Sequence, residues 1–448
     1  MRIRPSGITE SHLPQESHRR SVWVPPFGGY PGGDGARWDG MTPDRERSLR
    51  DICAETVARH AEELIGLSHR IHARPEPAFA EHQSMAAVAD LVAEHGFVVE
   101  RGVAGLDTAM VGTAGEGELV VGVCAEYDAL PEIGHACGHN IIAAASVGAA
   151  LALRAVADEL GVTVRLIGTP AEEVGGGKVL LLERGVFDGV AMAMMVHPSP
   201  YEMCEPRSKA IADFEVRYRG RASHAAAAPE LGVNAADAVT VAQVAIGLAR
   251  QHFEPGQQVH GIVTHGGAAP NIVPAHTSAM FNLRAAEIDS LRRLEHRIRC
   301  CLEAGAVATG ADWETVAISP DYAELRAEPR LVAAYRAAIV ELGRVPAGRD
   351  EEASRVVGST DMGNVTQLIP GIHPTISIDC GDAVPHQPEF AAACDTDSAD
   401  RAVLDGATAM AWTVVSAATN EGLRADLLAG AARRLATSGK SAATGGAA

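Results

Sequence analysis

The sequence has no Cys-x-x-Cys pair, although it contains eight cysteines. Irregular cysteine spacing in a chain of 448 residues disfavours a disulfide scaffold, which is typical of short secreted domains. The missing pair also excludes the zinc deaminase motif, in which His-x-Glu is followed by Cys-x-x-Cys. Reduced thiols favour a cytoplasmic location.

Positive charge and long apolar runs are also scarce. The chain has 38 Lys and Arg against 57 Asp and Glu, for a formal charge of −19. Nucleic acid and anionic membranes would not attract such a chain, so neither partner is expected. The longest apolar runs contain glycine or charges, and the apolar stretch near the N-terminus is short and ends in prolines. We therefore expect neither a transmembrane helix nor a signal peptide.

The chain does have enough apolar residues to bury a full core. Hydrophobic residues make up 47% and charged residues 21%, which is typical of a globular protein, and the length favours two domains. Residues 1–43 are rich in Gly, Pro, Arg and Ser without periodicity, and the tail over 431–448 has low complexity. We expect both segments to be disordered.

Apolar runs typical of buried strands alternate with helical patterns in the first half of the chain. One helix is predicted over 44–70, and a second over 140–160 lies between predicted strands at 119–124 and 162–167. A further strand is expected over 190–196. This alternation predicts an α/β sheet with helices on both faces.

The pattern changes after residue 208. Residues 211–219 alternate between apolar and polar, as in a half-solvated strand. We expect a small two-layer lid domain over 209–322, inserted into a larger domain formed by 44–208 and 323–430. Its other predicted elements are a helix, two strands, a helix and a strand, which complete a βαββαβ order: 234–251, 259–264, 278–284, 288–305 and 313–319.

Two short segments carry side chains suited to a metal ion and an activated water. Cys137 and His139 lie one residue apart, and Glu172 and Glu173 follow further along the chain. Thiolate and imidazole ligands suit Zn²⁺ or a similar divalent ion. One carboxylate of the pair can bind metal while its neighbour takes a proton. Separately, a buried cysteine is usually a small hydrophobe and a Glu pair a solvated loop, but together they predict metal-assisted hydrolysis.

Polar residues follow each predicted strand of the larger domain. Glu126 and Asp128 come after the first strand, the Glu172–Glu173 pair after the second, and His197 after the third. Because ligands bind at the carboxyl ends of strands in open α/β sheets, we expect these side chains at one edge.

The order and spacing of five motifs resemble those of the M20 metallopeptidases, in particular the aminoacylase-like amidohydrolases. The resemblance covers residue 45 to about 420. Asn140, which stands where many of these hydrolases have Asp, and the segment 359–365 are more similar to the p-aminobenzoyl-glutamate hydrolase and peptidase M20 domain-containing protein 2 subgroup. The matching segments are Tyr127–Pro131, Cys137–His139, Gly168–Glu173, Gly220–His224 and Pro270–Pro274.

This resemblance implies a zinc-exopeptidase-like mixed sheet flanked by helices, with an inserted two-layer α+β lid or dimerisation domain. The larger domain would then be the catalytic one. It also implies two divalent metal ions per subunit, Zn²⁺ first and Mn²⁺ or Co²⁺ as alternatives. Cys137 would bridge the two ions. The other implied ligands are His139, Glu173, His197 and His386.

The resemblance assigns roles to further residues. Glu172 would be the general base and then the general acid, and Asp128 would orient a ligand. His224 in the lid would reach a neighbouring subunit's site and polarise the scissile carbonyl, which implies a homodimer. Asn271 and Arg284 would bind the substrate.

Three other residues of this kind receive no such role. Glu126 stands where peptidases of the wider family carry a His ligand, and we do not assign it a metal. His135 and His373 are expected to be structural.

The expected activity is hydrolysis of the amide bond in N-acyl or N-aroyl amino acids, p-aminobenzoyl-glutamate among them, or in dipeptides. Two alternatives stay open. One is an aminohydrolase that acts on a non-peptide C–N bond with the same metal site, and the other is a non-catalytic protein that only binds metal or ligand.

Overall fold

The computed structural model describes residues 42–444, with only the backbone for 438–444. The disorder predicted for 1–41 and 445–448 lies outside the described residues. Within them, the prediction of a disordered tail from residue 431 is wrong, because helix α14 spans Glu421–Thr444. Leu427 and Ala431 of this helix are buried, and the Arg434 guanidinium donates to the Val190 carbonyl at 2.7 Å. Composition concealed these packed positions.

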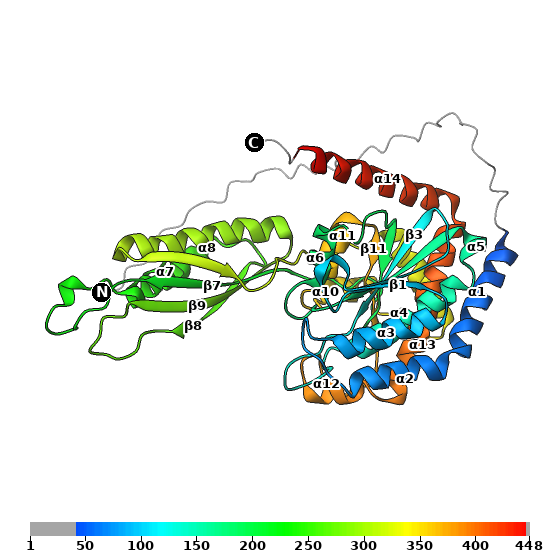
Figure 1. The fold of residues 1–448 in the computed structure, drawn as a ribbon, viewed down its shortest axis with the longest axis horizontal. Coiled ribbons are helices and arrows are strands. Elements are labelled where there is room, and N and C mark those ends of the chain that lie inside the picture. The colour runs from blue at the N-terminus through cyan, green and yellow to red at the C-terminus, as the bar shows by residue number, and fades with distance from the viewer. Residues whose placement is uncertain (1–41, 445–448) are drawn as a thin grey trace, which may run out of the picture. The chain divides into compact units, whose positions relative to one another are not determined.

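The larger part of the fold is built on a mixed sheet, which comprises six strands within residues 98–372 (Figure 1). β3 pairs in parallel with β4 and with β5, β11 pairs in parallel with β5, and β2 runs antiparallel to both β1 and β4. In spatial order the strands are β1 (Val98–Arg101), β2 (Met110–Ala114), β4 (Val162–Thr169), β3 (Leu119–Glu126), β5 (Met192–Met194) and β11 (Gly371–Ile372).

Helix α4 (His139–Arg154) is buried along almost its whole length and packs on α13 (Asp397–Thr419) and on β3. Its small residues permit this close packing, since a Cβ added at Gly148 would lie 2.8 Å from the Ala407 Cβ. The remaining helices around the sheet are α1 (Pro43–Arg59), α2 (Ala61–His72), α3 (His82–Glu94), α5 (Ala157–Leu160), α6 (Gly177–Glu183), α9 (Pro329–Glu341), α10 (Arg349–Ser354), α11 (Met362–Leu368) and α12 (Pro388–Ala393).

The single helix predicted over 44–70 is instead two helices, α1 and α2, which meet at His60. The backbone of His60 leaves the helical region, with φ −97° and ψ 11°, and its N–H donates to carbonyls of the last turn of α1. The His60 Nδ1 also lies 3.1 Å from Glu63 Oε2. These local hydrogen bonds satisfy both helix ends without continuing the helix.

A short parallel pair carries the chain from the main sheet toward the cavity described below. It joins β6 (His197–Ser199) to β12 (Thr375–Ser377), with His197 opposite Thr375.

The inserted segment forms an antiparallel sheet in the order β10-β7-β9-β8, covered by two helices. Burial alternates along β7, and the core of this layer includes Phe214, Phe281 and Leu302. The predicted βαββαβ order and the α/β fold class are confirmed, whereas the exact domain limits stay predictions. The elements are β7 (Ala210–Arg219), α7 (Ala235–Ala249), β8 (Gln258–His265), β9 (His276–Ala285), α8 (Ile288–Thr309) and β10 (Asp312–Ala317).

Candidate metal centre

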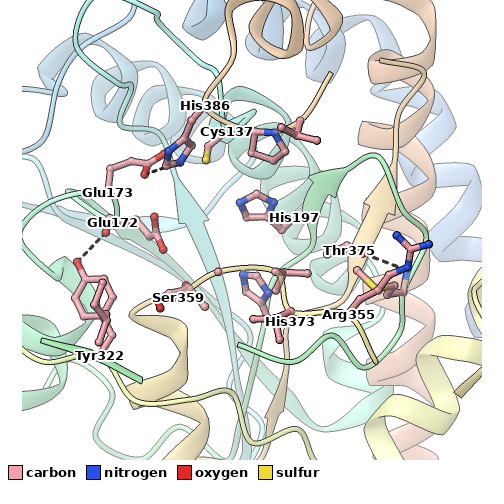
Figure 2. Close-up of a pocket in the computed structure, with 18 of the residues that line it drawn as sticks. Cys137, Glu172, Glu173, His197, Tyr322, Arg355, Ser359, His373, Thr375 and His386 are labelled. Atoms are coloured by element: carbon pink, nitrogen blue, oxygen red, sulfur yellow. Dashed lines mark hydrogen bonds and ion pairs between the residues drawn. The ribbon is translucent and has the colours of Figure 1, made fainter. Parts of the chain in front are cut away.

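The five predicted metal ligands lie together in the structure. Cys137, His139 and His197 place one ligating atom each within 4.8 Å of one another, and Cys137, Glu173 and His386 form a second group of the same kind. Cys137 belongs to both groups, as expected of a bridging ligand. Figure 2 shows Glu173 and His386 beside Cys137, where His386 Nε2 lies 3.4 Å from Glu173 Oε2.

The turn between β3 and α4 aims Cys137 and His139 at the site. Gly138 has a φ of 73°, and a Cβ at this position would lie 2.4 Å from the Pro198 Cγ, so the turn requires glycine. His139 begins α4 directly after this turn. The sequence Cys-Gly-His thus positions two ligands through one tight backbone turn.

Asp128 fixes the orientation of His139. Its Oδ1 lies 2.9 Å from His139 Nδ1, and its Oδ2 accepts the Glu173 N–H at 3.0 Å. Both side chains are buried. With Nδ1 bound to the carboxylate, Nε2 is the ring nitrogen left for an ion, which is the usual arrangement around a metal-bound histidine.

Backbone strain accompanies the two segments that carry Glu172 and His386. Ala171 and His386 have φ values of 58° and 72°, a region that non-glycine residues rarely occupy. The Ala171 N–H donates to Glu81 Oε1 at 2.8 Å, and the Tyr322 hydroxyl donates to the Glu172 carbonyl at 2.8 Å. Such strain, held by surrounding contacts, is concentrated at functional sites.

Burial and neighbouring charge set the protonation of this site in the metal-free chain. Burial, followed by the carboxylates of Glu126 and Glu173, raises the pKa of Glu172 well above its usual value. Burial and the Glu173 carboxylate likewise raise the pKa of the Cys137 thiol. Both groups therefore favour their protonated forms until a cation arrives nearby.

Several atoms at this site have no protein partner. Among the described residues, His139 Nε2, Glu126 Oε2 and Glu173 Oε1 are buried without a hydrogen bond. An unpartnered buried polar atom is costly, so their convergence beside a cysteine thiol needs an explanation. Divalent cations supply one, because imidazole nitrogen, thiolate and carboxylate oxygen are their protein ligands. The residues therefore fit the metal ions that the sequence predicts.

A cavity of about 630 Å³ opens onto this cluster (Figure 2). Glu172 and most of the predicted ligands line it, and Arg284 enters its wall from β9. His224 and Asn271 are not among its lining residues. His224 is exposed, and its Nδ1 accepts the backbone N–H groups of Ala226 and Ala227 at 3.2 and 3.1 Å. The chain's own His224 thus does not reach its own cavity, and its role at a neighbouring subunit stays a prediction.

The cavity wall also contains residues to which the sequence assigns no role. His373 is expected to be structural, but it lines the cavity with its ring centroid 5.6 Å from that of His197. It follows strand β11 directly, so the strand-end rule that found His197 would also have found it. Tyr322, Arg355 and Asp213 line the cavity as well, and no sequence pattern marks them.

Comparison with known proteins agrees with this arrangement. Residues 122–409 match Peptidase family M20/M25/M40. The chain is 36% identical to the Xaa-Arg dipeptidase of Mus musculus over 386 residues, covering 82% of this chain and 88% of the relative. It is 32% identical to a p-aminobenzoyl-glutamate hydrolase polypeptide of Escherichia coli (strain K12) over 264 residues, covering 54% of this chain and 55% of that one.

The fold is also shared with solved structures. A dinuclear metal binding peptidase from the M20 family of Bacillus subtilis aligns with a TM-score of 0.59 at 21% identity, covering 80% of this chain and 98% of that chain. The predicted family resemblance and fold are thus confirmed. The chain belongs to peptidase family M20/M25/M40 and is a hydrolase that acts on amide or peptide bonds.

Proposed function

We propose that this protein hydrolyses the amide bond of N-acyl or N-aroyl amino acids or dipeptides, with two divalent metal ions bound per subunit. The observation that carries the proposal is the pair of ligand groups that share Cys137, directly beside Glu172. Cys137, His139 and His197 would hold one ion, and Cys137, Glu173 and His386 the other, with Zn²⁺ favoured by the thiolate. Bound ions supply Lewis acidity and lower the pKa of a water molecule.

The protein's own groups then manage the proton. Glu172 accepts the proton of the attacking water and returns it to the departing amine, which suits a carboxyl group whose pKa is raised toward neutrality by burial. Asp128 keeps His139 in the tautomer that exposes Nε2. Tyr322 holds the backbone of Glu172 through its carbonyl.

Substrate binding is assigned to groups on the inserted domain. Arg284 lines the cavity, and its guanidinium suits the carboxylate that N-acyl amino acids and dipeptides carry. We further propose a homodimer in which the partner subunit's His224 polarises the scissile carbonyl. Asn271 would accompany it, since the Ala225 N–H donates to the Asn271 carbonyl at 3.0 Å.

We also propose a cytoplasmic location. All eight cysteines are free thiols, as a reducing compartment requires. Over the part of the chain that the structure describes, no helix has the length and apolar character needed to cross a bilayer.

An amide-hydrolysis screen of the purified protein tests this function. Protein loaded with Zn²⁺, Mn²⁺ or Co²⁺ is incubated with p-aminobenzoyl-glutamate, N-acetyl amino acids and dipeptides that include Xaa-Arg peptides, and the released amine is measured. We expect hydrolysis in at least one class and none after chelation. Release of ammonia from a non-peptide C–N bond instead would favour the aminohydrolase alternative. Metal binding without turnover on any substrate would favour the non-catalytic one.

A further inference from the structure

Three fully buried charged side chains lie against the metal centre. Lys178 on α6 places its Nζ 2.5 Å from Glu126 Oε1 and 2.7 Å from Asp361 Oδ1. The Lys178 N–H also donates to Asp361 Oδ2 at 2.8 Å. Glu126 is the last residue of β3, and Asp361 directly precedes α11. Lysine and its two carboxylates therefore connect three elements at the edge of the sheet.

Lys178 satisfies only one oxygen of Glu126. The other, Oε2, has no hydrogen-bond partner among the described residues and lies 3.4 Å from His139 Nε2. A ligating atom each from Glu126, His139 and Glu172 also falls within 4.8 Å of the others. Oε2 of Glu126 is thus a buried oxygen that faces the ligating nitrogen of a proposed metal ligand.

The separation of these two atoms matches two ligands of one ion. Ligands at about 2.0–2.2 Å from a metal, at tetrahedral or octahedral angles, are about 3.0–3.5 Å apart. Because Asp128 binds the Nδ1 side of His139, any ion on this ring is bound by Nε2. An ion bound there would have Glu126 Oε2 within ligating reach.

An ion pair without metal is the competing explanation. It requires a proton on His139 Nε2, but a histidine that binds metal must have this nitrogen free of protons. With metal chemistry at His139, two electron pairs would face each other across 3.4 Å unless a cation lay between them. The ion-pair explanation therefore fits only a protein that does not use His139 as a ligand.

We propose that Glu126 is a further carboxylate ligand of the metal centre and shares the ion bound by His139. Lys178, held by Asp361, is a positioning residue that occupies Oε1 and directs Oε2 toward that ion. The inference rests on the proposed metal centre, to which it adds a sixth ligand. It also accounts for a lysine buried without solvent contact, which is otherwise costly.

Metal binding by Glu126→Gln tests the proposal without relying on activity. The experiment uses the full chain in a His95→Ala background, because His60, Glu63 and His95 form a separate group of ligating atoms at the surface. Zn²⁺ affinity is measured by competition with a chelator, and the visible spectrum of the Co²⁺-loaded protein reports its coordination. We expect the parent protein to bind two ions. Glu126→Gln should bind one of them at least about 10–100-fold more weakly, with an altered Co²⁺ spectrum.

Glu352→Gln is the matched control. Glu352 is also a buried carboxylate, paired with Arg336 and with the Cys204 N–H, but it is not in any of these ligand groups. Its variant should keep both ions and the parent spectrum. Lys178→Met should weaken the same ion as Glu126→Gln does. If that variant fails to fold, Glu126→Gln combined with Lys178→Met removes the ion pair as a unit and keeps the measurement possible.

The outcomes separate this inference from the proposed function. A parent protein that binds no divalent ion overturns the metal centre and this inference with it. A parent that binds two ions, beside a folded Glu126→Gln variant with the same two affinities and spectrum, overturns this inference alone.

Discussion

Glu172 and Glu173 are neighbours in sequence, but the structure gives them different surroundings. Glu173 joins the ligand group with Cys137 and His386, whereas Glu172 faces the cavity and has its carbonyl fixed by Tyr322. Glu172→Gln keeps the shape and removes the proton acceptor, so turnover should fall by about 10²–10⁴-fold while metal content is unchanged. Steady-state kinetics with elemental analysis would check this.

The neighbouring ligands provide the comparison for that variant. Glu173→Gln and Cys137→Ala should lose metal together with turnover. If Glu172→Gln keeps activity within a few-fold of the parent, the base lies elsewhere.

Cys137 predicts how metal affinity depends on pH. Burial and Glu173 raise the pKa of its thiol, so the metal-free chain holds this proton at neutral pH. A metal ion binds the thiolate and displaces the proton, and affinity should therefore rise with pH. Zn²⁺ titrations in weakly buffered solution with a pH indicator should detect the released proton. An affinity that is constant with pH, without proton release, would contradict this prediction.

The candidate ligands could be predicted because local patterns determine their positions. Cys137 and His139 belong to one turn, and Glu173 and His197 follow strands whose ends meet at one edge. Lys178 and Asp361 could not be predicted as partners, because 183 residues separate them and a lysine after glycines resembles a surface loop. His224 stays open for another reason, since its proposed target is in another chain.

At the scale of elements, the rhythm of strands and helices predicted the sheet and the inserted layer, because buried strands and amphipathic strands leave distinct periodicities. It did not predict the break between α1 and α2, which depends on hydrogen bonds of His60, or the length of α14. Packing against the Val190 region orders this helix, and composition does not reveal such packing.

The turn that starts α4 gives a prediction about stability. Gly138→Ala would place a Cβ both at a φ of 73° and 2.4 Å from the Pro198 Cγ. Gly343 is the matched control, because it has a φ of 85° but no atom within 4 Å of an added Cβ. Gly343→Ala should cost about 1 kcal/mol through backbone strain, and Gly138→Ala about 1–3 kcal/mol more through crowding. Denaturant unfolding of the metal-free proteins would measure both, and equal losses would show that crowding is absent.

At the scale of the whole molecule, the exposed position of His224 makes a testable statement about assembly. If it serves the partner subunit, His224→Ala should cost about 2.7–4 kcal/mol in transition-state stabilisation, as for one oxyanion donor, with unchanged metal content. Mixed dimers of Glu172→Gln and His224→Ala chains should regain activity, because one site then combines an intact Glu172 with the partner's His224. Verified heterodimers without recovery would show that His224 acts in its own subunit or not at all.

The carboxylates buried around Lys178 have a consequence for the protein's lifetime. Glu126, Asp128, Glu172 and Asp361 are all buried there, and in the metal-free chain Lys178 is the one Lys or Arg among the described residues that forms an ion pair with any of them. Bound cations relieve this repulsion only in the folded state, so metal stabilises the protein by mass action, by about 2.7 kcal/mol at a hundredfold excess over Kd. Chelation should lower the Tm and speed proteolysis. A cell short of divalent ions would then lose the polypeptide itself by degradation, and restoring the ions would not recover activity without new synthesis.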